Sequence, residues 1–278
     1  MTRVEALQIE NVIRPRPGWI AVNWRELWDS RELLVFLVWR DITVRYKQTV
    51  LGVAWAVLQP LFSMLIFTVI FGRLAKMPSD GQPYALFVYA GLLPWMFFAN
   101  AVTGASQSLV NQQSLLTKIY LPRLFVPSAS IGGGMVDLAV SFGVFACLMI
   151  FYRVTPGLGM LALPLLVMLT VIAALGVGLS LAAVTVTYRD FRYVIPFMIQ
   201  AWMYVSPVIY PVSLVPAKWQ WLLAINPMAG IIDGYRSSLL GQPWNLLTLS
   251  ISALSAILML VYGLFYFRKT ERRFADVA

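Results

Sequence analysis

Asp137 is the side chain whose position most suggests chemistry, because it is an acid inside a long apolar run, residues 124–152. An ionisable group at that depth in a membrane is costly, and it serves either a function or a structural contact. One hypothesis is proton coupling, which needs a cationic partner in another apolar run, and no other run offers one in its interior. The sequence favours the other hypothesis, a structural carboxyl that is protonated or hydrogen-bonded to neighbouring helices.

The rest of the chain contains few residues of the types that carry out enzyme chemistry. It has no His, which excludes His-ligated metal sites and Ser-His or Cys-His catalysis. Its one cysteine, Cys147, allows no internal disulfide. There is no GxxxxGK(S/T) phosphate loop, and the glycine run at residues 132–134 lies in an apolar stretch, where close helix packing is the expected role. We predict no catalytic residue, no metal site and no cofactor held by this chain.

Two apolar runs carry aromatic side chains interleaved with amide or hydroxyl groups. The residues are Trp55, Gln59 and Phe62 in the run 48–72, and Phe197, Tyr204 and Tyr210 in the run 193–217. Such surfaces suit stacking against sugar rings while offering only weak polar anchors, which would let a polymer slide. Lipid contact or core packing is the alternative for each of them.

The composition indicates that lipid is the solvent of this protein. Of its 278 residues 60% are hydrophobic and only 12% are charged, too apolar for one soluble core. A net charge of +9 could suggest nucleic acid, but most basic residues flank apolar runs, where they oppose anionic lipid and fix topology. We therefore expect membrane lipid as a partner and no nucleic acid. The first 20 residues contain no apolar segment typical of a cleavable signal peptide.

Six runs with little or no charge are long enough to cross the hydrocarbon, which needs about 20 residues. The predicted spans are about 50–72, 84–109, 125–152, 158–187, 193–212 and 246–267. A further apolar piece between Lys218 and Asp233 is too short to cross and is broken at Asn226-Pro227, so we interpret it as re-entrant or interfacial. The predicted fold is an all-α polytopic membrane protein with six transmembrane helices.

The basic residues predict the orientation of these spans. With six spans, sixteen of the 21 Lys and Arg residues fall on one side, the side that holds both termini. By the positive-inside rule this side is cytoplasmic. The expected organisation is a cytoplasmic N-terminal segment, 1–47, a transmembrane domain, 48–267, and a cytoplasmic tail, 268–278.

Residues 31–47 have the pattern of an amphipathic helix that lies in the headgroup layer. Its apolar face holds Val35, Trp39, Ile42 and Tyr46, and its polar face holds Arg40, Thr43 and Lys47. Asp41 and Arg45 have the i,i+4 spacing of an ion pair. Upstream, Asn23 and Glu26 have the spacing of a capping box that would begin this helix.

Two connections on the predicted cytoplasmic side are basic and aromatic. Loop 111–123 has an amphipathic pattern that ends at Pro122, and a second projection covers residues 188–193. Their basic residues could serve topology alone. The alternative is contact with a cytoplasmic motor subunit, which we favour because the chain lacks an energy source of its own.

Over nearly its whole length the chain resembles the permease subunits of polysaccharide-exporting type-2 ABC transporters, and most of all the lipopolysaccharide O-antigen members. The motifs that carry the resemblance are WRDITVRYKQ (39–48), Leu51-Gly52, LQP (58–60), GLLPW (91–95) with Asn100, KIYLPR (118–123), YRD (188–190), SPVIY (206–210), Asn226-Pro227 and Tyr235-Arg236. RPRP (14–17) and NWRE (23–26) at the beginning of the chain resemble the O-antigen members in particular.

The resemblance implies a homodimer of permeases joined to two copies of a cytoplasmic P-loop ATPase, which would hold ATP and Mg. It implies ATPase coupling through the amphipathic helix and the loops 111–123 and 188–192. The coupling residues are then Arg40, Asp41, Arg45, Lys47, Leu115, Lys118, Tyr120, Arg123, Arg189, Asp190 and Arg192. The first and fifth spans would line a path for the glycan, which favours the sugar-contact role of the aromatic residues.

By the same resemblance, residues 213–241 would form short gate helices at the periplasmic mouth, before the last span. The gate residues are Trp219, Trp221, Asn226, Pro227, Tyr235 and Arg236. The expected function is export of a lipid-linked O-antigen-like polysaccharide across the bacterial cytoplasmic (inner) membrane. Capsular polysaccharide or teichoic acid export is the alternative, followed by a drug or lipid ABC permease and by a membrane glycan-modifying enzyme.

Overall fold

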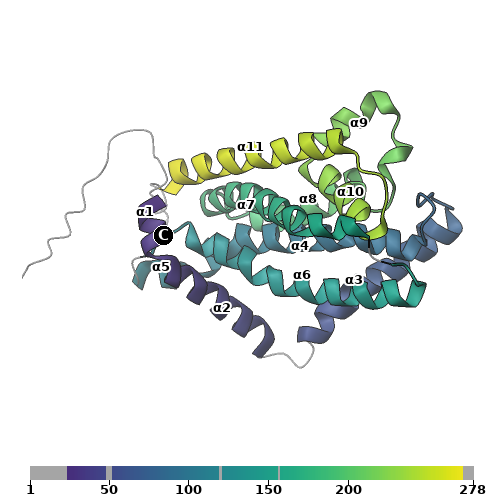
Figure 1. Ribbon diagram of the computed structural model, residues 1–278. Helices are drawn as coiled ribbons and strands as arrows, with labels where there is room; N and C mark the ends of the chain where they lie inside the picture. Colours follow the sequence, from purple (N-terminus) through teal and green to yellow (C-terminus); the bar gives the residue numbers. More distant parts are fainter. Residues whose placement is uncertain (1–23, 48–51, 119–120, 156, 272–278) are drawn as a thin grey trace, which may run out of the picture.

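The computed structural model describes residues 24–47, 52–118, 121–155 and 157–271 (Figure 1). Within these ranges the chain is helical and contains no strand, as predicted. The elements in chain order are α1 (Trp24–Asp29), α2 (Arg31–Lys47), α3 (Gly52–Phe67), η1 (Thr68–Leu74), α4 (Tyr84–Asn111), α5 (Gln113–Lys118), α6 (Phe125–Tyr152), η2 (Leu158–Ala162), α7 (Leu163–Thr187), α8 (Phe191–Val205), η3 (Val212–Leu214), α9 (Ala217–Ala224), α10 (Pro227–Leu240) and α11 (Leu246–Glu271).

Helix α4 is the centre of the bundle. It is buried along most of its length and packs against α3, α6, α7, α8 and α10. The apolar side chains of Leu86, Phe87, Val88 and Phe98 on α4 are fully enclosed. A helix that is apolar on all sides is stable when apolar groups surround it. Around α4 these groups come from the other helices of the protein rather than from lipid.

Small residues let the helices of the bundle approach closely, as the sequence predicted. A Cβ placed on Gly263 of α11 would lie 2.3 Å from the backbone oxygen of Gly176 on α7. The glycine run in α6 has the same role, because a Cβ on Gly132 would lie 2.9 Å from Val38 of α2 and one on Gly134 would lie 3.3 Å from Phe97 of α4. These contacts confirm the packing interpretation of the glycines.

The connections between helices are sorted to two opposite ends of the bundle (Figure 1). At one end lie α1, α5 and the end of α11, where Arg123 donates a hydrogen bond to the Glu271 carbonyl over 2.8 Å. At the other end Ser213 donates to Asp80 over 2.9 Å, and the Ser238 hydroxyl donates to the Gly159 carbonyl over 2.7 Å. Helices α4, α6, α7 and α11 therefore run from end to end.

Five helical stretches of the described residues are long and apolar enough to cross a membrane, rather than six. They are Ala54–Leu74, Tyr84–Asn111, Phe125–Tyr152, Leu158–Thr187 and Leu246–Glu271. The predicted span 193–212 corresponds to α8, which has 15 residues and ends at Val205. Its length is about 22 Å at 1.5 Å per residue, against about 30 Å of hydrocarbon. The helix stops because Pro207 has no N–H to continue it.

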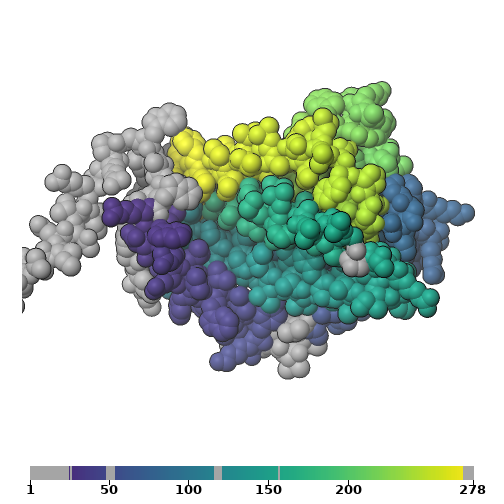
Figure 2. Space-filling view, in the orientation of Figure 1, coloured from purple at the N-terminus to yellow at the C-terminus, as the bar shows by residue number. Residues whose placement is uncertain are grey.

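The predicted break at Asn226-Pro227 is confirmed. Two short helices, α9 and α10, meet there, and the Asn226 side chain caps α10 by accepting a hydrogen bond from the Met228 amide over 3.1 Å. Pro227 occupies the first turn, where its missing N–H needs no partner. Almost every residue of α10 is buried within the protein, whereas α9 lies at the surface (Figure 2).

Candidate functional site

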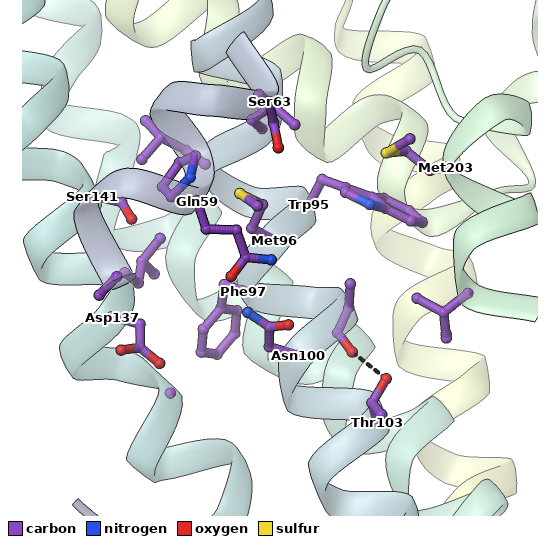
Figure 3. Close-up of a pocket in the computed structure, with 18 of the residues that line it drawn as sticks. Gln59, Ser63, Trp95, Met96, Phe97, Asn100, Thr103, Asp137, Ser141 and Met203 are labelled. Carbon is purple, nitrogen blue, oxygen red and sulfur yellow. Dashed lines mark hydrogen bonds between the residues drawn. The ribbon is translucent and has the colours of Figure 1, made fainter. Parts of the chain in front are cut away.

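A cavity of about 1080 Å³ lies between α3, α4, α6 and α8. Figure 3 shows that Gln59 of α3 and Asn100 of α4 carry their amides into the same space. Hydroxyl and amide groups of Ser63, Ser141 and Gln200 also line it. The wall therefore offers neutral hydrogen-bonding groups spread over four helices.

Aromatic and aliphatic side chains form the rest of the wall. Trp55, Trp95, Phe97 and Tyr204 line the cavity, together with Met203. Large flat rings beside neutral polar groups are suited to stack on sugar rings and to bind hydroxyls, with no strong anchor at any one point.

Proline residues shape two of the cavity walls. Pro60 lies inside α3 directly after Gln59, and Pro196 lies inside α8. Each proline removes a helical hydrogen bond to the carbonyl four residues earlier, which for Pro60 is Ala56. Ala56, Pro60 and Pro196 all line the cavity, so the turns that contain these prolines lie at its wall.

Arg45 and Asp137 are the two charged residues that line the cavity. They form an ion pair, and the Tyr46 hydroxyl donates a hydrogen bond to the second oxygen of Asp137. Burial, and then the hydrogen bond to Asp137, raise the pKa of Tyr46 to about 12, so Tyr46 is a hydrogen-bond donor at neutral pH. We call these three residues the α2–α6 clasp, because they join the end of α2 to the middle of α6.

The clasp gives Asp137 the structural partner that the sequence favoured, but from an unexpected element. A cationic partner was expected only in another apolar run, whereas Arg45 belongs to the amphipathic helix. The expected i,i+4 partner of Arg45 was Asp41, and Asp41 instead contacts Arg40 over 2.7 Å. Arg40 also donates to the Gln112 side chain over 2.6 Å, which ties α2 to the end of α4.

The coupling residues predicted on α2 are thus placed in two ways. Arg40, Asp41 and Arg45 contact α4 or α6 of their own chain, while Lys47 is exposed. In the α4–α6 connection, Leu115 packs against the apolar residues of α2, and Arg123 binds the end of α11. Tyr120 and the side chain of Lys118 lie outside the described residues.

The turn before α8 presents the remaining coupling residues. Arg189, Asp190 and Arg192 are exposed, and Arg192 donates to the neighbouring Tyr193 hydroxyl over 2.6 Å. This turn follows the end of α7, where Val186 packs with Leu121 in the apolar cluster at the α5 end of the bundle. Arg189, Asp190 and Arg192 therefore lie at the α5 end of the molecule, whereas Lys47 follows the α2–α6 clasp, beside the middle of α6.

Half of the predicted glycan-contact residues line the cavity. Trp55, Gln59 and Tyr204 do so, whereas Phe62 and Phe197 lie on the exposed outer surface, with 73% of Phe197 accessible. Tyr210 lies beyond the end of α8, and its hydroxyl donates to the Val205 carbonyl over 3.1 Å. Sequence reasoning missed the polar residues of α4, Asn100 and Thr103, which line the cavity although α4 is the most buried of the five candidate spans.

The predicted gate residues fall into two groups. Trp219 and Trp221 are exposed on α9. Pro227, Tyr235 and Arg236 are buried in α10, with Tyr235 stacked on Phe142 at a ring distance of 6.1 Å.

Asn226 joins these short helices to the end of α8. Its Oδ1 accepts a hydrogen bond from the Trp202 indole over 3.1 Å, and its Nδ2 donates to the Ser206 hydroxyl over 2.8 Å. The end of α8 is therefore attached to the junction of α9 and α10.

An all-helical chain with several membrane-crossing helices and an open cavity of neutral polar and aromatic groups has the architecture of a multi-pass membrane transport subunit. Residues 32–240 match the family of ABC-2 type transporters, and the chain belongs to this family.

Three relatives are transport permeases or transport proteins. The chain is 28% identical over 247 residues to an O-antigen export system permease protein of Klebsiella pneumoniae, covering 88% of this chain and 95% of the relative. It is 29% identical over 215 residues to the O-antigen export system permease protein of Myxococcus xanthus, covering 77% and 82%. It is 23% identical over 240 residues to a polysialic acid transport protein of Escherichia coli, covering 84% and 91%.

Proposed function

We propose that this protein is the membrane-spanning subunit of an ATP-driven exporter that moves a lipid-linked, O-antigen-like polysaccharide across the bacterial cytoplasmic membrane. The names of the O-antigen export relatives support this substrate class. Export of a capsular polysaccharide is the second candidate, because the polysialic acid transport protein is also a relative. The chain itself carries out no bond chemistry in this proposal.

The cavity is the observation that carries the proposal. Its wall combines the amides of Gln59, Asn100 and Gln200 with the rings of Trp55 and Tyr204. A sugar polymer needs many weak, replaceable contacts in order to move, and neutral amides and rings supply such contacts without holding any one sugar tightly. The two charged residues of the wall, Arg45 and Asp137, pair with each other.

A second copy of the chain would close the open side of this cavity. The outer faces of α3 and α8, which flank it, carry large exposed apolar side chains. These are Trp55, Leu58, Phe62, Leu65 and Ile66 on α3 and Val194, Phe197, Met198 and Tyr204 on α8. Exposed apolar faces of this extent suit a protein partner as well as lipid. The proposed assembly is a homodimer with the glycan path between the two permeases.

Energy would come from two copies of a cytoplasmic P-loop ATPase that hold ATP and Mg. The exposed residues Arg189, Asp190 and Arg192 at the α5 end are available for this contact. With them on the cytoplasmic side, α1 and the end of α11, which lie at the same end of the bundle, are cytoplasmic as well, in agreement with the positive-inside count. ATPase movements would reach the cavity through α2, whose clasp lies at the cavity wall.

Deletion of the gene in its native host tests the proposal. We expect loss of a surface polysaccharide and accumulation of the lipid-linked polymer inside the cell, both restored by the wild-type gene. A tagged chain purified from native membranes should bring a P-loop ATPase with it in equal amount. Unchanged surface polysaccharide in the deletion strain, with no polymer accumulating inside, would refute the function. Loss of capsule with intact O-antigen would select the second candidate.

A further inference from the structure

The segment that follows α8 is irregular and yet buried. Helix α8 ends at Val205, and residues 206–211 are not helical. Ser206 and Val208 are 0% exposed, and Ile209 is 4% exposed. Backbone carbonyls removed from water need hydrogen-bond donors, and in a membrane protein an irregular segment is tolerated only where the protein supplies them.

Four carbonyls of this segment, and the carbonyl of Val205 directly before it, have such donors. The Tyr210 hydroxyl donates to the Val205 carbonyl (3.1 Å), and the Val208 amide donates to the Ser206 carbonyl (2.7 Å). The Tyr84 hydroxyl donates to the Ile209 carbonyl (2.8 Å). Arg236 donates to the carbonyls of Val208 (2.7 Å) and Tyr210 (3.3 Å). Arg236 alone supplies two of them, and it comes from α10, a different helix.

Arg236 is fully buried, and it donates hydrogen bonds to three backbone carbonyls. Besides the two carbonyls of the irregular segment, its Nε donates to the Phe87 carbonyl of α4 over 3.2 Å. Its guanidinium carbon lies 3.6 Å from the centre of the Phe87 ring. The planar fork of an arginine can hold donors in three fixed directions, which the point charge of a lysine cannot do.

The sequence makes room for this group at Gly91 of α4. A Cβ on Gly91 would lie 2.8 Å from Nη2 of Arg236 and 3.1 Å from the Val208 carbonyl oxygen. Any side chain at this position would push the guanidinium and the irregular segment away from α4. Gly91, Ser206–Tyr210 and Arg236 therefore form one packing unit, although they are far apart in the sequence.

The geometry points to Arg236 as the positioning residue that holds the broken end of α8 against α4. Because α8 supplies Ile199, Gln200, Met203 and Tyr204 to the cavity, Arg236 thereby fixes one wall of the cavity from a helix that does not line it. The position of the α8 wall can be measured without knowing the transported substrate.

Cysteine protection in native membranes tests this role. In a Cys147→Ser background, Val208→Cys places a thiol in the segment and Val126→Cys places one in an equally buried site near the opposite end, each being 0% exposed as valine. With Arg236 present, both thiols should resist a small maleimide. With Arg236→Met we expect labelling at position 208 to become at least about tenfold faster, with position 126 still protected; Gly91→Ala should act in the same direction.

The outcomes separate a local role from a general one. Protection of both thiols in the Arg236→Met protein would overturn the inference, and so would labelling of both, because Arg236 would then stabilise the whole bundle rather than this segment. In Arg236→Lys, labelling at position 208 should be closer to that in Arg236→Met than to that in the wild type. Full protection of position 208 in Arg236→Lys would contradict the role of the planar guanidinium. The deletion experiment can refute polysaccharide export and leave these labelling results unaffected.

Discussion

Two arginines mark two contrasting regions of this molecule. Arg236 lies where α4, α10 and the end of α8 meet, is 0% exposed and donates hydrogen bonds to three backbone carbonyls. Arg45 lies at the cavity wall, with 41% of its side chain accessible, and pairs with the Asp137 carboxylate. Water can replace the partner of Arg45 but not those of Arg236, so the first contact is suited to change and the second to persist.

The surroundings of the two arginines differ in the same way. The region of α4, α7, α10 and α11 is packed through glycines and fully enclosed side chains. The helices α2, α3 and α8 each contribute to the cavity wall and have large exposed faces. We infer that α4, α7, α10 and α11 form a rigid support. The helices that would contact substrate, α2, α3 and α8, are attached to this support by fewer contacts.

The largest expected effect comes from a change in the rigid region. Gly263→Val should prevent close packing of α11 on α7, because its Cβ would lie 2.3 Å from the Gly176 oxygen, and the cost is roughly 3 kcal/mol. Thermal stability of the detergent-purified protein measures it. The matched control is Gly143→Ala, because nothing lies within 4 Å of a Cβ there. Equal stability of the two variants would show that the α7–α11 contact is not close.

A charge reversal at the α5 end should have a large effect on assembly and little on stability. Arg189 is exposed in the turn before α8, so Arg189→Glu should reduce the amount of co-purified ATPase several-fold without changing membrane insertion. Lys218→Glu, on exposed α9, is the control because it lies at the other end of the bundle. If Lys218→Glu lost the ATPase and Arg189→Glu kept it, the proposed motor surface would be at the wrong end.

The smallest expected effect comes from the α2–α6 clasp. Asp137→Asn removes the ion pair with Arg45 but keeps a carbonyl oxygen that can accept from Tyr46, so we expect a loss of about 1 kcal/mol, because both partners remain partly accessible to water. Thermal unfolding of Asp137→Asn, Arg45→Gln and the double variant measures the coupling between them. Strictly additive losses would mean that the two side chains do not interact.

The sequence predicted the long helices well and the broken one poorly. The predicted spans 84–109, 125–152 and 158–187 match α4, α6 and the η2–α7 stretch closely, because length and apolar composition suffice to define them. The predicted span 193–212 was too long, since the residues after Val205 are as apolar as those before it. Only Pro207 signals the break, and hydropathy does not register it.

The site was harder to predict than the fold, because its contacts join distant residues. Arg45 and Asp137 are 92 positions apart, and no local pattern pairs a residue of an amphipathic helix with an acid inside an apolar run. Trp55, Gln59 and Tyr204 could be identified from their types and spacing. Asn100 and Thr103 could not, because their helix has no distinct polar face until the neighbouring helices are placed around it.

Photo-crosslinking in living cells tests the central claim, that the polysaccharide passes through the cavity, most directly. A photoreactive phenylalanine analogue at position 59 would lie in the cavity wall, and the same analogue at position 265 would lie on the exposed face of α11. After illumination we expect the surface polysaccharide to be attached to the chain substituted at Gln59 and not to the chain substituted at Phe265. Absence of polymer at position 59, or equal capture at both positions, would contradict the claim.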